Sequence, residues 1–382
     1  MSVKGLTDTV VRHRRTLHQI PELEFDLYKT HAYVKDVLTS LGYELEVMAK
    51  TGIVAVKRGA TSDFVAFRSD MDALPVTEQT NVSFASTHPG AMHACGHDGH
   101  MSMLLGFAEY LSDKTLHQSV LLIFQPAEEG PGGAKVMMEE GLFTKYSIKR
   151  IYGFHVYPEL DEGVVGLVDG PMMPQNAEFD VVVRGRSAHG AQPHKGIDAI
   201  VAAAALVQAY QTIVSRSTHS HQSAVVTIGT IQGGEARNII AGDVSLSGTI
   251  RAFDPATYEL IKERMRSIVQ GLETMYGVVI ENDIVDYYPP VINDSDLVRE
   301  VTSLFSDGER QMIEPMMFSE DFAFYQQVVP GCFMMLGTKN EAKQFTAPLH
   351  NNKFNFTDEV LLQGVEAYRR IAVLNKIIQD NE

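Results

Sequence analysis

The chain has 382 residues, of which 45% are apolar and 21% charged, and its formal net charge is −16. This length exceeds one ordinary hydrophobic core and predicts roughly two domains. The acidic balance argues against nucleic acid or an anionic membrane as a partner, because both require clustered lysine and arginine. With only two cysteines, Cys95 and Cys332, a disulfide framework is not expected.

Neither a secretory signal nor a membrane span is expected. Residues 1–20 contain basic side chains but no apolar run of the kind that signal peptides carry. The longest apolar stretch, 199–207, is shorter than the ~20 residues that a membrane-spanning helix needs. We therefore expect a cytoplasmic protein with no membrane partner.

The chain begins with two predicted helices. Apolar residues recur at helical spacing over 6–20, and a second helix is expected over 27–41, where Gly42 ends it. Short β-rich runs follow at 53–56 and 64–67. Helices in alternation with short apolar strands are typical of an α/β sheet.

Three further apolar strands are predicted at 120–124, 151–154 and 331–337, with a helix at about 134–140. Polar or acidic residues follow most of these strands. Because open α/β sheets bind ligands outside the carboxyl ends of their strands, the loops after the strands are expected to share one cleft.

A separate small domain is expected in the middle of the chain, after a proline-rich change of composition at 171–174. The pattern there predicts strand, helix, strand, strand, helix and strand, at 179–183, 198–214, 224–231, 244–250, 255–276 and 278–285. This βαββαβ order is that of the split βαβ, or ferredoxin-like, sandwich. The expected fold is therefore an α/β catalytic domain (1–175 and 290–382), with a mixed sheet and helices on both faces. An α+β domain (176–289) interrupts it.

Two motifs point to metal chemistry. Residues 92–100 contain three histidines, one thiol and one carboxylate, and residues 125–130 contain the pair Glu128–Glu129. Imidazole and thiolate groups suit zinc and its neighbours, and adjacent glutamates can divide the work between binding a metal and moving protons.

Metal ligands must come from several segments, and the chain offers five candidates: Cys95, His97, Glu129, His155 and His350. Five such side chains suit two ions, which can activate a shared water when they lie ~3.5–4 Å apart. Glu128 cannot easily bind the same ion as Glu129, because neighbouring side chains diverge on an extended turn. It is therefore the expected general base.

Five motifs, at 69–75, 93–100, 126–130, 187–196 and 349–350, resemble in order those of the aminoacylase/carboxypeptidase-type di-metal peptidases. The Cys-Gly-His-Asp version of the second motif resembles the amidohydrolase branch. That branch includes hippurate hydrolases, indole-acetyl-amino-acid hydrolases and N-acetyldiaminopimelate deacetylases. The resemblance covers nearly the whole chain, including the inserted domain.

The resemblance implies that the five candidates bind two divalent ions per subunit, Zn, Mn, Co or Ni, and that Glu128 is the acid/base. Asp70 falls where the carboxypeptidase branch has a histidine ligand, and Cys95 supplies the replacement. Asp72 is expected to orient a ligand histidine. Asp98, at the head of an apolar helical pattern, is expected to cap that helix and, like Asp70 and Asp72, to support the ligands.

His93 and His100 are not expected to bind metal, because five ligands already fill the site. In the resembled family the inserted domain forms a lid and usually a dimer contact, which predicts a homodimer or higher homo-oligomer. His189 is expected to hydrogen-bond the developing oxyanion, often across the subunit interface. Asn238 and Arg251 are expected to hold the carboxylate or main-chain groups of the substrate.

His194 is interpreted as structural. The family commonly carries Asn-Val-Ile-Pro where this chain has Asn-Ile-Ile-Ala at 238–241.

The predicted reaction is hydrolysis of an N-acyl amino acid, with an N-acetyl or aryl-acyl group, to a carboxylic acid and a free amino acid. A dipeptidase or aminopeptidase on the same scaffold is the alternative. A metal-dependent binding protein without catalysis is disfavoured by the intact pair Glu128–Glu129. An oxidoreductase using Cys95 is disfavoured because no resolving cysteine lies nearby and no dinucleotide fingerprint is visible.

Overall fold

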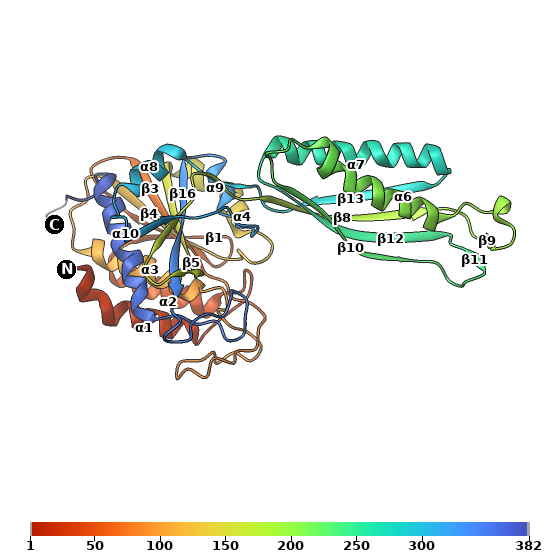
Figure 1. Cartoon of the computed structure of the whole chain (residues 1–382). Helices are drawn as coiled ribbons and strands as arrows, with labels where there is room; N and C mark the ends of the chain where they lie inside the picture. The colour runs from red at the N-terminus through yellow and green to blue at the C-terminus, as the bar shows by residue number, and fades with distance from the viewer. Residues whose placement is uncertain (1, 380–382) are drawn as a thin grey trace. The chain divides into compact units, whose positions relative to one another are not determined.

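The computed structural model describes residues 2–379, and the chain divides into two compact units (Figure 1). The first unit consists of Met1–Gly170, Ile292–Glu314 and Asp321–Glu382. The second consists of Pro171–Val291 together with the short segment Pro315–Glu320. The sequence-based division assigned residues 315–320 to the catalytic domain, since nothing in their composition distinguishes them.

An eight-stranded sheet forms the centre of the first unit, in the order β1-β2-β4-β3-β5-β16-β6-β15. Its strands are β1 (Glu44–Met48), β2 (Gly52–Lys57), β3 (Asp63–Asp70), β4 (Ser119–Gln125), β5 (Ser147–Asp161), β6 (Val165–Leu167), β15 (Arg310–Met312) and β16 (Gly331–Lys339). β4, β3, β5 and β16 are parallel neighbours, whereas β2 pairs antiparallel with β4, and β6 antiparallel with β16. The sheet is therefore mixed, as predicted.

Helices cover both faces of this sheet. They are α1 (Thr7–His18), α2 (Tyr28–Ser40), α3 (His97–Ser112), α4 (Gly133–Glu139), α5 (Leu142–Lys145), α8 (Ser295–Thr302), α9 (Ala323–Gln326) and α10 (Leu361–Leu374), with 3-10 turns η1 (Val3–Leu6) and η4 (Asp358–Val360).

Because side chains alternate along a strand, one set of sheet residues, such as Val65 and Phe67, packs with α1, α2, α3 and α10. The opposite set includes Phe333, whose ring lies 4.9 Å from that of Phe322 beside α9.

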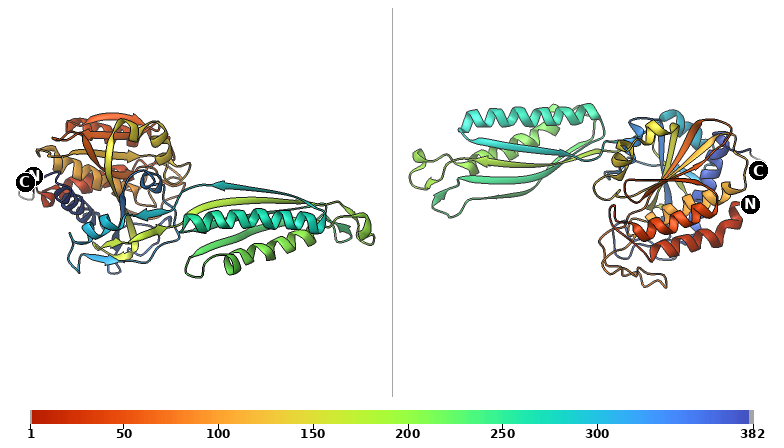
Figure 2. Two further views of the ribbon diagram at one scale, coloured as in Figure 1. Left: turned by 90° about the horizontal axis from the view of Figure 1, so that it is seen from above. Right: turned by 180° about the vertical axis from the view of Figure 1, so that it is seen from behind.

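The second unit has the βαββαβ order that the sequence predicts. Its elements are β8 (Gln175–Arg184), α6 (Ala199–Thr212) continued by a π-helical turn η3 (Ile213–Ser217), β10 (Ala224–Gly233), β12 (Asp243–Ala252), α7 (Pro255–Tyr276) and β13 (Val279–Asp286). The strands form an antiparallel sheet in the order β10-β12-β8-β13, and α6 and α7 cover one face of it (Figures 1 and 2). This is the ferredoxin-like arrangement.

Capping residues define the two helices of this unit. Asp198 accepts hydrogen bonds from the backbone N–H groups of Ile200 and Val201, and Asp254 accepts one from Thr257 at 2.7 Å. Smaller elements complete the chain: β9 (Ala188–His189) pairs with β11 (Ile239–Ile240), β7 (Gly170–Met173) pairs with β14 (Val291–Asn293), and η2 spans Pro193–Lys195.

One helical segment, Ala199–Ser217, is long and apolar enough to cross a membrane by length and composition alone. This is weak evidence for a span, because a core helix meets the same criterion. Ala202, Leu206 and Tyr210 of this segment are fully buried in the apolar core of the second unit. The exposed Ile200 and Val201 lie on its other side.

Candidate metal centre

The candidate site lies where several elements of the first unit end or begin. β4, β3 and β5 are parallel neighbours, so their carboxyl ends lie at one edge of the sheet. Asp70 ends β3, the pair Glu128–Glu129 follows the end of β4, and His155 lies in the second half of β5. The N-terminus of α3 brings His97 to the same edge.

Gly96 allows α3 to begin this close to β5. Its φ of +90° is left-handed, and a Cβ at this position would lie 2.4 Å from Cγ2 of Val156. Gly96 is the N-cap of the helix, so the expectation that Asp98 caps α3 was wrong. Asp98 lies in the first turn, where it accepts a hydrogen bond from His18 at 2.8 Å and lies 3.5 Å from Nε of Arg14.

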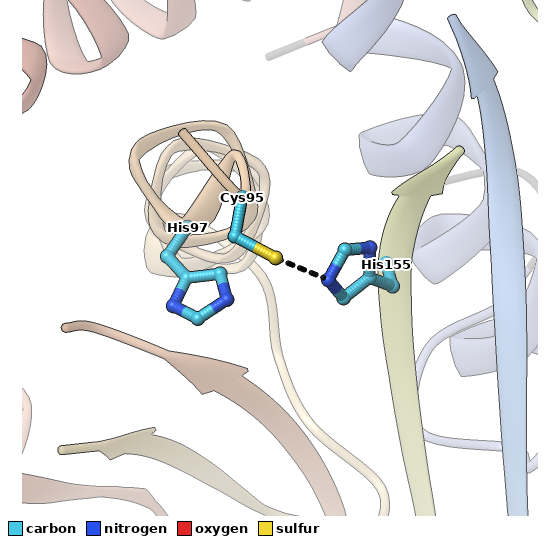
Figure 3. A group of neighbouring side chains, drawn as sticks. All are labelled: Cys95, His97 and His155. Carbon is cyan, nitrogen blue, oxygen red and sulfur yellow. Dashed lines mark hydrogen bonds between the residues drawn. The ribbon is translucent and has the colours of Figure 1, made fainter. Parts of the chain in front are cut away.

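Cys95, His97 and His155 form the first group of possible ligands (Figure 3). Their ligand atoms lie within 4.8 Å of one another, and Sγ of Cys95 lies 3.3 Å from Nε2 of His155. Nδ1 of His155 donates to the carbonyl oxygen of Val156 at 2.7 Å, which leaves the Nε2 lone pair directed at the thiol. Burial and the neighbouring His100 lower the pKa of His155 to about 3. The ring of His155 is therefore neutral and keeps a lone pair on Nε2.

Glu129 and His350 join Cys95 in a second group. Oε1 of Glu129 lies 3.3 Å from Nε2 of His350 and 3.8 Å from Nε2 of His97. Burial alone would raise the pKa of Glu129, but the contact with His350 and the charge on His97 outweigh it and lower the pKa to about 2. Burial, followed by the charges of the two glutamates, raises the pKa of the Cys95 thiol. All five side chains that the sequence nominated thus lie in two overlapping groups.

His97, a member of the first group, also lies close to Asp70, at the end of β3, and to Asp72. Its Nδ1 is 3.5 Å from Asp72 and 3.7 Å from Asp70. Burial alone would lower the pKa of His97, but the neighbouring carboxylates raise it to about 10. Within residues 2–379, neither ring nitrogen of His97 nor Oε1 of Glu129 has a hydrogen-bond partner. Buried polar atoms without partners, beside an excess of carboxylates, fit a bound cation.

Asp72 holds the Glu128–Glu129 dipeptide in place. Its two carboxylate oxygens accept the backbone N–H groups of Glu128 and Glu129, each at 3.0 Å. The preceding Ala127 has a φ of +56°, an uncommon conformation for a residue with a side chain. An oxygen of the Glu128 carboxylate lies within 4.8 Å of ligand atoms of both His97 and Glu129, so the expectation that the two neighbouring glutamates diverge was wrong.

Arg68 and Asp321, which the sequence did not single out, support the site through buried hydrogen bonds. The fully buried Arg68 binds Oδ2 of Asp70 at 2.9 Å and Oδ1 of Asp321 at 2.7 Å. Asp321 also accepts the backbone N–H of Ala134 at 2.9 Å. The sequence feature that could have revealed this pair is an arginine within an apolar strand, because a buried charge needs a partner of opposite charge. His93 is also buried, and it belongs to none of the candidate ligand groups in the described part of the chain.

His189 and Asn238 lie together in the second unit. β9 and β11 pair His189 with Ile239, and the N–H of Gly190 donates to the carbonyl oxygen of Asn238 at 2.7 Å. Arg251 lies at the far end of β12 from this pair. Since β11 is followed directly by the start of β12, and a strand of this length spans about 30 Å, one copy of the unit cannot bring Arg251 and His189 to the same small molecule.

Residues 66–373 match the peptidase family M20/M25/M40. The chain belongs to this family. Among its relatives, an N-acetyldiaminopimelate deacetylase from Bacillus licheniformis is 39% identical over 364 residues, which cover 94% of this chain and 96% of the relative. A second protein of that name, from Listeria monocytogenes, is 38% identical over 354 residues, covering 91% and 94%.

Solved structures of similar proteins extend over the whole fold. A putative aminohydrolase from methicillin-resistant Staphylococcus aureus superposes with a TM-score of 0.92 at 35% identity, covering 98% of each chain. A dinuclear metal-binding peptidase of the M20 family from Bacillus subtilis gives 0.84 at 31% identity, covering 98% of this chain and 100% of that one. The predicted family and fold class are confirmed, and the chain is a metal-dependent amide hydrolase.

Proposed function

We propose that this chain hydrolyses the amide bond of N-acyl amino acids and that N-acetyldiaminopimelate is its substrate. The observation that carries the proposal is the convergence of a thiol, three imidazoles and a carboxylate beside Glu128, a second carboxylate. The relatives at 38–39% identity that bear the name N-acetyldiaminopimelate deacetylase support the choice of substrate.

Two divalent ions would be held by the five converging side chains: Cys95, His97, Glu129, His155 and His350. A set of one thiolate, three imidazoles and one carboxylate suits Zn, Mn, Co or Ni. Bound there, the ions would polarise the scissile carbonyl and lower the pKa of the attacking water.

Glu128 carries the proton in this mechanism. Its carboxylate takes a proton from the attacking water and returns it to the nitrogen of the departing amine. Asp72 fixes the backbone of Glu128, which keeps the carboxylate of Glu128 within 4.8 Å of the ligand atoms of His97 and Glu129. Of the two adjacent glutamates, Glu128 thus transfers protons and Glu129 binds metal.

Residues of the second unit would bind the rest of the substrate. The imidazole of His189 donates a hydrogen bond to the oxygen that becomes negative when the carbonyl is attacked. Arg251 and Asn238 bind the carboxylate and main-chain polar groups. Because Arg251 lies far from both His189 and Asn238 in one unit, the His189 and Asn238 that serve each site come from a partner subunit of a homodimer or higher oligomer.

Glu128→Gln tests the catalytic assignment. The variant keeps the shape of the side chain but cannot accept a proton, so kcat should fall by about 10²- to 10⁴-fold. The metal content, measured by elemental analysis, should equal that of the wild type. Turnover retained in the metal-loaded variant would remove Glu128 from this role.

A substrate panel tests the reaction class. Protein freed of metal by a chelator should be inactive, and each of Zn, Mn, Co and Ni is then added back separately. The panel contains N-acetyldiaminopimelate, N-acetyl, N-benzoyl and indole-acetyl amino acids, and dipeptides with a free amino group. We expect N-acetyldiaminopimelate to give the highest kcat/KM. Preference for the dipeptides would instead identify a dipeptidase.

A further inference from the structure

His100 is a buried histidine whose two ring nitrogens are both engaged by the protein. Its Nε2 lies 2.9 Å from the backbone nitrogen of Val156, and its Nδ1 lies 2.6 Å from Oδ1 of Asp70. A backbone N–H can only donate, so Nε2 must be the acceptor and the ring proton must sit on Nδ1, facing Asp70. His100 therefore has no lone pair left for a metal, although its atoms lie near those of His97.

The hydrogen bond from Val156 replaces a missing strand partner. The pairing of β3 with β5 ends at Arg68 and Gly153, whereas β16 continues along the other edge of β5 past His155. Beyond Gly153, His100 supplies the acceptor that β3 no longer provides. The position of β5 around residue 156 thus depends on a side chain from α3.

The same stretch of β5 orients His155. The carbonyl oxygen of Val156 accepts the Nδ1 proton of His155 at 2.7 Å, and the rings of His100 and His155 are 4.5 Å apart at an angle of 62°. These contacts determine which nitrogen of His155 is free and where it points. That nitrogen, Nε2, is the one 3.3 Å from Sγ of Cys95.

Asp70 is itself held rigidly behind His100. Oδ1 of Asp70 accepts a hydrogen bond from Nδ1 of His100, and Oδ2 accepts one from Nη1 of Arg68 at 2.9 Å. Arg68, Asp70 and His100 are all at most 1% exposed. A continuous series of buried hydrogen bonds therefore connects Arg68 and Asp70 of β3, through His100, to the backbone of Val156, which binds the candidate ligand His155.

We propose that His100 is a positioning residue of the metal centre: together with Asp70 it anchors the backbone of Val156, which orients His155 toward the ion shared with Cys95. This inference rests on the proposed function, because it takes His155 to be a ligand. It assigns a role to a histidine of the second motif that binds no metal itself. Side chains that orient ligands in this way contribute about 10- to 100-fold to metal affinity.

Two variants of His100 separate its two hydrogen bonds. In His100→Gln the side-chain oxygen reaches the position of Nε2 and can still accept from Val156. In His100→Asn the amide reaches only the position of Nδ1, so it keeps Asp70 but leaves the N–H of Val156 without an acceptor. The matched control is His13→Gln on α1, which removes a buried histidine bonded to Tyr33 and Glu109, outside the candidate ligand groups.

The readouts are Zn²⁺ affinity, by competition with a chromogenic chelator, and the thiolate-to-cobalt absorption band of the Co²⁺-loaded protein. We expect His100→Asn to lower the affinity for one of the two ions by about 10- to 100-fold and to shift the band. His100→Gln should restore most of the affinity. His13→Gln should lower the melting temperature of the metal-free protein without changing either metal readout.

Equal affinity and an unchanged band in His100→Asn would overturn the inference while leaving the proposed function intact. Failure of the wild type to bind any of the four ions would instead defeat the proposed function. If His100→Asn does not fold, ¹⁵N-histidine NMR of the wild type decides the matter. His100 must then show the neutral tautomer protonated at Nδ1, and a proton found on Nε2 would exclude the hydrogen bond from Val156.

Discussion

Asp70 and Asp72 are two residues apart, yet they bind different parts of the candidate metal centre. Asp72 accepts the N–H groups of Glu128 and Glu129, whereas Asp70 accepts the proton of His100. Side chains two apart on an extended chain point the same way, so both carboxylates reach the site while the intervening Met71 is buried in the core. The end of β3 and the two residues after it therefore align the loop after β4 and His100 of α3, and His100 in turn contacts β5.

His18 gives a residue-scale prediction about stability and pH. It bridges Asp98 at 2.8 Å and Glu78 at 3.1 Å in the interior. Burial alone would lower the pKa of His18, but the two carboxylates, Asp98 foremost, raise it from 6.5 to about 9. A raised folded-state pKa stabilises the protein fully below pH 6.5, and this contribution is lost as the pH rises through 9.

Replacing His18 by Gln should therefore destabilise the protein by about 2 kcal/mol at pH 6, because it removes a buried charge-assisted bridge. The difference from the wild type should shrink as the pH approaches 9. Urea unfolding of both proteins at pH 6, 7.5 and 9 measures this. A difference that is constant over the series would mean that the pKa of His18 is the same in the folded and the unfolded protein.

At the scale of elements, most helices and strands follow from local sequence pattern, and two exceptions, β5 and the start of α3, have identifiable physical causes. The apolar run at 151–154 predicts only part of β5, because Pro158 and Glu159 are residue types that strands disfavour. The strand continues because Tyr157 pairs with Gly337 and Asp161 pairs with Lys339 of β16, a segment far away in the sequence. Asp98 was expected to cap α3 from its residue type, but the left-handed Gly96 begins the helix instead.

Gly96→Ala tests how closely α3 must approach β5. The substitution adds a Cβ 2.4 Å from a methyl group of Val156 and forces a left-handed φ on alanine. We expect a loss of about 1–3 kcal/mol in unfolding free energy and a weaker metal site. Urea unfolding and zinc titration measure the two effects.

Gly271→Ala is the matched control, because Gly271 lies inside α7 and no heavy atom lies within 4 Å of an added Cβ. It should stabilise the helix by about 0.5–1 kcal/mol and leave metal affinity unchanged. If Gly96→Ala were as harmless as this control, the close approach of α3 to β5 would not matter.

At the scale of the whole molecule, the motifs nominate the candidate ligands, but their geometry depends on tertiary structure. Residue types and family resemblance nominated Cys95, His97 and His350. Neither reveals that Arg68 is bonded to Asp321, which lies 253 residues later, or that both nitrogens of His100 are occupied. Such contacts arise only when distant strands become neighbours in the sheet, and no local pattern encodes them.

The second unit also limits how a complete site can form. His189 lies on β9 and Arg251 at the opposite end of β12, so a single small substrate cannot touch both residues of one copy. The proposed exchange of His189 between subunits predicts complementation between two inactive variants. Glu128→Gln lacks the base in its own site, and His189→Ala fails to serve the site of its partner.

Co-expression with two different tags allows purification of the heterodimer of Glu128→Gln and His189→Ala. In that heterodimer, one site combines an intact Glu128 with the intact His189 of the other chain, while the second site lacks both. Its activity should be about half that of the wild-type dimer, whereas both parent homodimers should be nearly inactive. If His189 served its own chain, both sites of the heterodimer would be defective. A heterodimer no more active than its parents, or a monomeric wild type in light scattering, would therefore exclude the exchange.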